Sequence, residues 1–278
     1  MPDLPLGAVI AFDFKAWNVA DEIALLQAVG VRRVHVYRNY THGITADYIR
    51  DTLAAARLAA DGLHGYFQLE KFEVGGPVFD PSSDSEPIRE ASIEILRGEA
   101  DFARTLGCTD IAVHPVSKDN SVADPWRPAA FARTARDLAE IGRAKGVRYL
   151  LENMPPRQFG ADAGYLRRLV DEIASPHLGL LYDSGHAALS GDPVGTIRTM
   201  GPRLWGVHLH DNRGAEDDHF IPGMGTLPFE AVARALAEVG YAGTFTIEVY
   251  RPTEEVRRDL TPARLAYIEK LRRIASGL

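Results

Sequence analysis

The feature that most constrains this chain is a strand-like run that recurs eight times, each followed by a helical stretch. The runs are short and β-branched, end in a polar residue, and lie within residues 7–12, 28–37, 59–70, 105–115, 143–153, 174–186, 200–211 and 238–250. The stretches between them have apolar residues three and four apart, the spacing of amphipathic helices. Strict alternation of strand and helix predicts parallel strands joined by right-handed helical crossovers.

Eight such units favour a closed barrel of the α/β class over an open sheet. An open doubly wound sheet that binds a dinucleotide has a glycine-rich turn after its first strand, but AFDFKAWN (11–18) contains no glycine. No low-complexity segment or Pro/Gly/Ser linker divides the 278 residues. The sequence therefore predicts one (β/α)8 TIM barrel, a single domain over residues 1–278.

The charge balance argues against a protein whose main task is to grip nucleic acid. Lys and Arg number 31 against 38 Asp and Glu, a net charge of −7, whereas proteins that bind phosphodiester backbones are usually basic. The single cysteine, Cys108, indicates a reducing compartment. The N-terminus has no cationic leader before an apolar stretch, and no run approaches 18 apolar residues. We expect a cytoplasmic protein without a membrane span, and we leave a homo-oligomer open.

The residues that close the strands are the candidates for chemistry, because active sites of such barrels lie at the C-terminal ends of the strands. Strands four to eight are expected to end in His114, Glu152, Asp183, His208 and Glu248. Side chains alternate along a strand, so each polar residue faces opposite its apolar neighbours. We infer that all five point toward the barrel axis.

Carboxylates that converge in a small mouth repel one another and lose hydration, so a cation is expected among them. Glu152, Asp183, His208 and Glu248 offer hard oxygens and one nitrogen, which suits one divalent metal such as Mn²⁺, Mg²⁺ or Co²⁺, with Zn²⁺ also open. His210 lies on the same face of the strand as His208. The spacing does not decide between these two histidines, and we favour His208 because it is closer to the barrel.

A second group of polar residues lies beside the first in the sequence. His186 follows Asp183 in DSGH, and the loop after the seventh strand contains Asp217 and His219. Together with His114, these residues could bind another metal or hydrogen-bond the hydroxyls of a substrate. Arg213 in the same loop is a candidate clamp for an anion or hydroxyl. Solvated loop charges, a buried imidazole and an exposed arginine are the alternatives.

The other histidines begin strands or lie in loops, where core or surface roles are expected: His35, His42, His64 and His177. Three aromatic residues near strand ends could line the pocket or simply pack: Trp17, Phe67 and Tyr250.

These motifs carry a resemblance that covers nearly the whole chain. LLENMP, YDSGHAALSGDP, GVHLHDNRGAEDDHFIPGMGTLPF and GTFTIEVY occur in an order similar to that of the xylose-isomerase-like TIM-barrel superfamily. That superfamily holds sugar isomerases and epimerases and the endonuclease IV group. The resemblance implies that the shared metal ligands are Glu152, Asp183, His208 and Glu248. In the epimerase branch it further implies that His186 and Arg213 touch the sugar.

The endonuclease IV branch implies a different use of the same residues. There, three zinc ions are held by these four ligands, by His114, His186, Asp217 and His219, and by one more histidine after the third strand. At that place this chain reads GYFQLEKFE (65–73), with Gln68, Glu70 and Glu73 but no histidine. The missing ligand and the negative charge disfavour a zinc phosphodiesterase acting on abasic DNA, which we keep as the alternative.

The leading hypothesis is a divalent-metal-dependent isomerase or epimerase of a sugar or sugar phosphate. An α-hydroxy carbonyl substrate would chelate the metal, Glu152 or Glu248 would remove a proton, and the cation would stabilise the enediolate. Return of the proton by the other glutamate gives an epimer or an isomer. Loss of a β-hydroxyl instead would make the protein a dehydratase, a lyase that we also keep open. Backbone N–H groups of GMG (223–225) could bind a phosphate.

Overall fold

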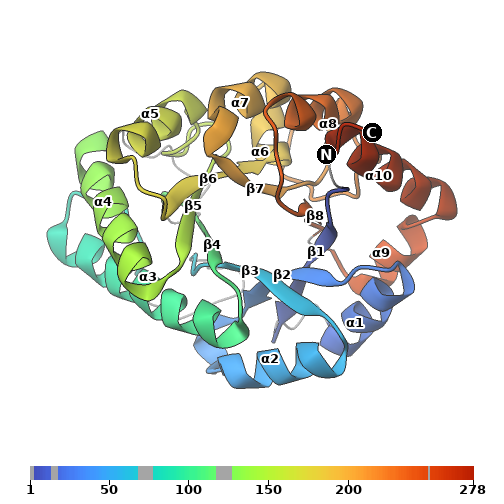
Figure 1. Cartoon of the computed structure of the whole chain (residues 1–278), viewed down its shortest axis with the longest axis horizontal. Helices are drawn as coiled ribbons and strands as arrows, with labels where there is room; N and C mark the ends of the chain where they lie inside the picture. Colours follow the sequence, from blue (N-terminus) through green and yellow to red (C-terminus); the bar gives the residue numbers. More distant parts are fainter. Residues whose placement is uncertain (1–2, 14–17, 68–77, 117–126, 250) are drawn as a thin grey trace.

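The structure, a computed structural model, is a barrel of parallel strands surrounded by helices (Figure 1). It describes residues 3–13, 18–67, 78–116, 127–249 and 251–278. In these residues the sheet has eight strands: β1 (Leu6–Phe12), β2 (Arg33–Arg38), β3 (Ala59–His64), β4 (Asp110–Val113), β5 (Arg148–Glu152), β6 (Leu178–Asp183), β7 (Leu204–His208) and β8 (Phe245–Ile247). The expected (β/α)8 TIM barrel is confirmed.

The barrel closes between β7 and β8, one residue beyond the end of β7. The sheet runs in the order β7-β6-β5-β4-β3-β2-β1-β8, and Leu209 bridges to Ile247 in parallel. Leu209 N donates to Thr246 O at 2.9 Å, and Glu248 N donates to Leu209 O at 3.0 Å. This closure brings the residues on either side of Leu209 next to Glu248.

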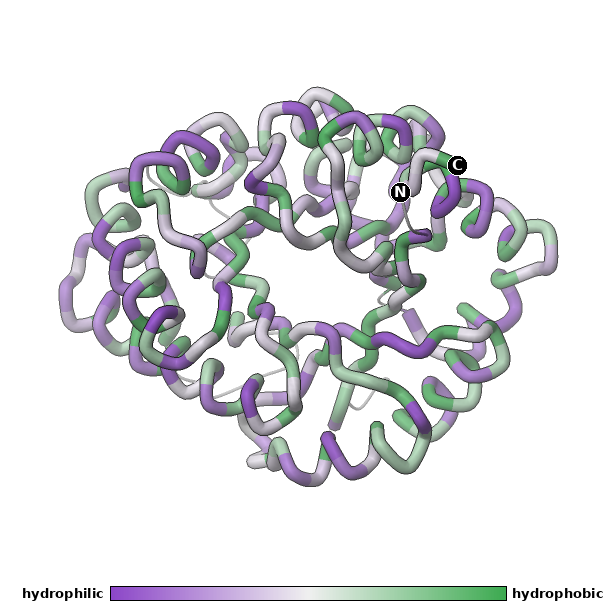
Figure 2. The backbone as a smooth tube through the Cα atoms, viewed as in Figure 1, coloured by the Kyte–Doolittle hydropathy of each residue, from purple (hydrophilic) through white to green (hydrophobic). Residues whose placement is uncertain are grey.

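The helices form the outer ring of the barrel. They are α1 (Val19–Ala28), α2 (Ala46–Ala55), α3 (Glu86–Leu106), α4 (Pro128–Lys145), α5 (Ala163–Ile173), α6 (Ser184–Leu189), α7 (Pro193–Met200), α8 (Phe229–Glu238), α9 (Thr253–Asp259) and α10 (Pro262–Ala275), with short 3-10 turns at Tyr40–His42 and Gly201–Arg203. Each helix contains both hydrophilic and hydrophobic residues, as expected of amphipathic helices (Figure 2). No described helix is both long and apolar enough to cross a bilayer.

The ends of the longest helices follow from local sequence. α4 begins at Pro128, where a missing N–H costs no helical hydrogen bond, and ends before Gly146 in the left-handed region at φ 69°. α3 ends in the same way before Gly107 at φ 89°. Both glycines turn the chain directly into the next strand, β4 or β5.

Among the described residues, the core has one large cluster and two small ones. The larger one fills the space between barrel and helices, and its fully buried side chains include Phe12, Phe131 and Tyr182. A smaller one, with Ala112 and Leu150, lies apart from it and accounts for packing inside the barrel. Parallel strands that are buried on both faces have nearly continuous apolar sequences, and for this reason the sequence predicts the strands of the barrel.

Glu22 of α1 is a half-buried acid beside the large core cluster, and its ionisation is expected to destabilise the fold. Its Oε2 accepts from Ala11 N at 3.0 Å, and it lines a largely apolar cavity of about 340 Å³ between β1, β8 and the helices α1, α9 and α10. Burial raises the pKa of Glu22 from 4.5 to about 7, although the bond from Ala11 opposes this. The folded state therefore binds an extra proton between pH 4.5 and 7, and stability falls as pH rises through that window.

Glu22→Gln removes this cost and keeps an oxygen for Ala11. We expect the variant to be more stable than the wild type at pH 8 by about 1–3 kcal/mol, with a smaller difference at pH 4.5. Urea unfolding at both pH values measures it. Glu90→Gln, on the exposed face of α3, is the control and should change neither value. Equal stabilities of Glu22→Gln and wild type at pH 8 would contradict the expectation.

Candidate metal centre

Ionisable side chains close five successive strands at the same end of the barrel. β5 ends at Glu152, β6 at Asp183 and β7 at His208, while His114 follows β4 and Glu248 follows β8 directly. All five are buried, and Asp183 and His208 have no exposed surface. The structure therefore brings together the residues that the sequence placed at the barrel mouth.

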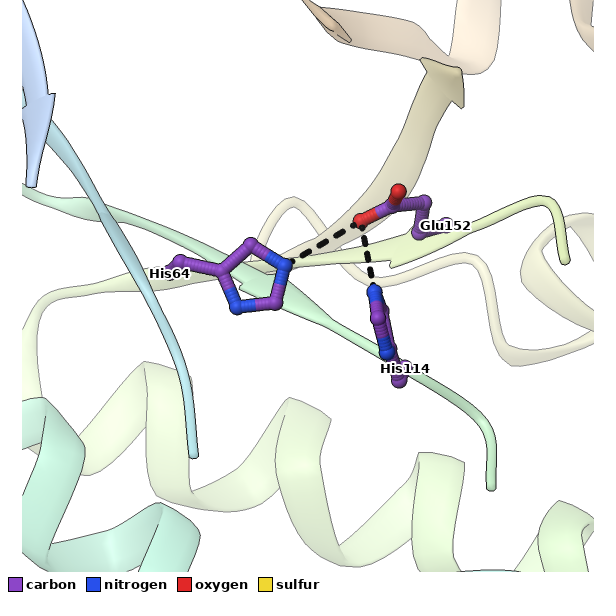
Figure 3. A group of neighbouring side chains, drawn as sticks. All are labelled: His64, His114 and Glu152. Atoms are coloured by element: carbon purple, nitrogen blue, oxygen red, sulfur yellow. Dashed lines mark ion pairs between the residues drawn. The ribbon is translucent and has the colours of Figure 1, made fainter. Parts of the chain in front are cut away.

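Glu152 is surrounded by imidazoles (Figure 3). Its Oε2 lies 3.4 Å from His114 Nε2, 3.6 Å from His64 Nε2 and 3.7 Å from His208 Nδ1. Burial by itself would raise the pKa of Glu152. The attraction of His114 and His208 outweighs burial and holds the pKa well below its usual value, so the carboxylate is ionised.

Glu248 faces different partners with its two oxygens. The Tyr37 hydroxyl donates to Oε1, and His208 Nδ1 lies 3.3 Å from the same oxygen. Oε2 lies 3.6 Å from His210 Nε2 and 3.7 Å from His219 Nδ1. Glu248 thus connects the residues around Glu152 with the loop after β7.

Three residues hold Asp183 in place: His186, Asn153 and His210. It caps α6 by accepting from His186 N at 2.7 Å, and Asn153 bonds both its backbone N–H and its carbonyl. His210 Nε2 lies 3.0 Å and 3.1 Å from its two carboxylate oxygens. Burial alone would raise its pKa, but His186 and His210 lower the pKa to about 2.

The sequence left open whether His208 or His210 reaches the barrel mouth. In the structure both side chains do. Burial lowers the pKa of each, but the carboxylates outweigh burial and raise the pKa of both to about 9. Gly185 leaves room for this arrangement, because a Cβ there would lie 2.0 Å from His210 Cε1.

The second group of predicted residues lies beside the first. Asp217 Oδ2 is 3.1 Å from His219 Nε2 and 3.3 Å from His186 Nε2. The rings of His210 and His219 stack with centroids 3.9 Å apart. His186 also lies 3.6 Å, through Nδ1, from Glu152 Oε1, so the two groups form one continuous cluster.

Two histidines expected in the core or at the surface, His64 and His35, lie in or beside the cluster. His64 ends β3 and lies in the cluster beside His114, so the third strand does supply a histidine at the barrel mouth. The argument from a missing ligand is therefore wrong. Gln68, Glu70 and Glu73 lie outside the described residues. His35, from the middle of β2, also faces the cluster, with Nδ1 3.4 Å from His208 Nε2.

Other predicted residues lie at the rim. Arg213 is exposed, and its guanidinium lies 4.8 Å from the ring centroid of Phe220. Its contact with a sugar stays a prediction. Phe67 packs against the rings of His64 and His114 at 4.5 and 5.0 Å, as a pocket wall would. Trp17 and Tyr250 lie outside the described residues.

The expectation that GMG (223–225) binds phosphate is not supported, because its N–H groups already have an acceptor. Gly223 N and Gly225 N donate to Asp211 Oδ2 at 3.0 and 2.8 Å. Leu227 N and Asn212 N donate to the other oxygen at 3.1 and 2.9 Å. Asp211 is fully buried, so its carboxylate organises the loop from within.

The donor set fits a divalent cation. Donor atoms within 4.8 Å of one another occur in three groups: Glu152, Asp183 and His208; His64, His114 and Glu152; and His210, His219 and Glu248. Within the described residues, Glu152 Oε2, Glu248 Oε2 and His208 Nδ1 are buried and have no hydrogen-bond partner. Buried carboxylate oxygens without partners are costly, and a cation would satisfy them.

Comparison with known proteins gives a family match and several relatives. The profile described as the xylose isomerase-like TIM barrel matches residues 23–275. An uncharacterized protein of Methanocaldococcus jannaschii is 31% identical over 180 residues, which are 61% of this chain and 60% of that protein. Fructoselysine 3-epimerase of Escherichia coli O157:H7 is 24% identical over 182 residues, covering 64% of this chain and 66% of that enzyme. The chain spans about three fifths of the length of these curated relatives.

Solved structures share the whole fold. The crystal structure of a D-tagatose 3-epimerase-like protein superposes with a TM-score of 0.74 at 22% identity, covering 96% of this chain and 99% of that chain. At this identity the likeness concerns the fold.

Proposed function

This chain belongs to the xylose isomerase-like TIM barrel family, and on that premise we propose that it is a divalent-metal-dependent isomerase or epimerase of small sugars or sugar phosphates. The observation that carries the proposal is the pair Glu152 and Glu248. Both are buried, both face His208 Nδ1, and each has an oxygen with no hydrogen-bond partner in the described residues.

The residues that would hold the cation are Glu152, Asp183, His208 and Glu248. When bound, a divalent cation supplies Lewis-acid stabilisation of the charge that develops on the oxygens of an α-hydroxy carbonyl substrate. Glu152 is kept ionised by His114 and His208, so the carboxylate oxygen that does not hold the cation can accept the proton of the carbon next to the carbonyl. Glu248, in its carboxylic acid form, can then give a proton to the intermediate and become ionised, and in the reverse direction the two side chains exchange these roles.

Epimerisation is the form of this reaction that the relatives favour. The names of the relatives and neighbours include fructoselysine 3-epimerase and a D-tagatose 3-epimerase-like protein, and the ketoses in these names have a carbonyl beside the inverted carbon. For this chain we therefore propose a ketose, with or without a phosphate. We propose that His186, which lies in the cluster, hydrogen-bonds a hydroxyl of the substrate, and that Arg213 does the same from the rim of the site.

Proton exchange with solvent tests the proposal directly. The metal-stripped protein, reloaded with Mn²⁺, Mg²⁺ or Co²⁺, is incubated with a panel of ketoses and ketose phosphates in D2O and followed by NMR. We expect deuterium at the carbon next to the carbonyl and the appearance of an epimer or isomer. Loss of water from the substrate would point to the dehydratase alternative. No exchange with any metal or ketose would contradict the proposal.

A second candidate function, a zinc phosphodiesterase on abasic DNA, is favoured by one observation. His64 lies with His114 and Glu152 in a group that could hold a separate metal ion. The net charge of −7 still opposes DNA binding. Elemental analysis separates the two: one metal per chain supports the isomerase, whereas about three zinc ions with cleavage of abasic duplex at low salt would support the nuclease.

A further inference from the structure

Strand β2 has none of the expected metal ligands, yet two of its side chains touch ligands from other strands. His35 and Tyr37 are two residues apart and so lie on the same face of β2. The Tyr37 hydroxyl donates to Glu248 Oε1, and His35 Nδ1 lies 3.4 Å from His208 Nε2. Both residues are buried, with 3% of Tyr37 and 8% of His35 exposed.

Local backbone structure directs His35 inward. The pairing of β2 with β3 shifts register between Val34 and His35, so that His35 lies opposite Gly62 and Asp61 is the extra residue. Such bulges re-aim side chains next to functional sites. Gly62 is required here, because a Cβ at that position would lie 3.0 Å from two atoms of the His35 ring.

The two nitrogens of His208 have different neighbours. Nδ1 faces the carboxylates of Glu152 and Glu248, at 3.7 and 3.3 Å, whereas Nε2 faces His35. A cation among the carboxylates would take the lone pair of Nδ1, which leaves the proton of His208 on Nε2. Nε2–H can then donate to His35 Nδ1. Histidine ligands generally donate their second nitrogen to a partner that fixes the ring, and here that partner is a second imidazole.

We propose that His35 and Tyr37 are positioning residues of the metal centre, His35 for the ring of His208 and Tyr37 for the carboxylate of Glu248. The inference rests on the proposed function, because it assumes that these ligands hold a cation. The two side chains thus support two expected ligands, His208 at the end of β7 and Glu248 after β8. Neither side chain needs to contact the substrate.

A cavity at the N-terminal end of the barrel reaches His35 from the side opposite the mouth. It has a volume of about 230 Å³ and is lined by His35, Gly62, Thr246 and the ion pairs Arg33–Asp61 and Arg148–Asp110. Replacing His35 by alanine would enlarge this cavity by the volume of an imidazole ring. Free imidazole could therefore enter and replace the missing side chain.

Titration of the full-length, metal-stripped protein with Mn²⁺, followed by EPR of the free ion, tests the inference. We expect Tyr37→Phe and His35→Ala to weaken Mn²⁺ binding by about 10- to 100-fold. Imidazole should restore most of the loss in His35→Ala and none in Tyr37→Phe. Tyr149→Phe is the matched control: its hydroxyl is buried and donates to Leu96 O at 2.7 Å, far from any ligand, so Mn²⁺ affinity should not change.

The outcomes separate this inference from the proposed function. Wild-type protein that binds no Mn²⁺ would overturn the inference, and wild-type protein that binds none of Mn²⁺, Mg²⁺, Co²⁺ and Zn²⁺ would overturn the proposed function as well. Wild-type binding with affinities of Tyr37→Phe and His35→Ala within twofold of it would overturn the inference and leave the proposed function standing. Tyr37→Phe removes one oxygen atom and decides the question even where His35→Ala does not fold. An equal loss in Tyr149→Phe would assign the effect to general destabilisation and also overturn the inference.

Discussion

Glu152→Gln and Glu248→Gln are each expected to lower the rate of solvent-proton exchange into a ketose by about 10²–10⁴-fold. Glutamine has nearly the same shape as glutamate, but its amide cannot accept the proton from carbon. The environment of Glu152 favours this role, because His114 and His208 hold its pKa well below the usual value and keep the carboxylate ionised. Deuterium incorporation followed by NMR measures the rate.

Metal content must be measured alongside, because the same oxygens are expected to hold the cation. Each variant is compared with the wild type at saturating Mn²⁺, so that the loss reports proton transfer rather than lower occupancy of the metal site. Glu99→Gln makes the same change at a buried glutamate that pairs with Arg38, outside the cluster, and should leave the rate unchanged. Full exchange in both Glu152→Gln and Glu248→Gln would rule out the assignment of acid and base.

The barrel could be predicted from the sequence because its main signal is local. Each strand is a short apolar run, and α4 shows the helix signals clearly, with Pro128 at its first position and Gly146 after its last. Polar residues that end such runs were equally visible, so Glu152, Asp183 and His208 were placed correctly at the mouth. Their roles as metal ligands and catalytic groups stay predictions.

His64 shows where local signals fail. Tyr66 and Phe67 continue the apolar character beyond Gly65, so the sequence places the third strand within residues 59–70 with Phe67 near its end, which is too late. In the structure β3 ends at His64 itself. The pattern of an apolar residue, a histidine and then a turn residue occurs again at His114, before Pro115, and that likeness could have identified the site residue.

His35 and GMG (223–225) could not be assigned, because their environments depend on distant residues. The inward direction of His35 follows from a register shift between β2 and β3, which depends on Gly62 of the neighbouring strand. The N–H groups of Gly223 and Gly225 resemble a phosphate site in the sequence. Their acceptor is Asp211, which approaches only when the loop folds back on the end of β7.

Asp211→Asn is expected to destabilise the protein by about 3–5 kcal/mol, since a buried charged acceptor is lost and two of the four N–H groups that it binds lose their acceptor. The amide keeps one oxygen but turns an NH2 toward other donors, so the backbone from Gly223 to Leu227 loses its anchor. Urea unfolding measures the change. Asp218→Asn is the control in the same loop: Asp218 Oδ2 accepts from Arg213 N at 3.1 Å on the exposed side, and the loss should stay within about 1 kcal/mol. Because this loop carries Asp217 and His219 to the cluster, we also expect weaker binding of any cation that these residues hold. An Asp211→Asn variant as stable as the wild type would show that the loop is held by other contacts.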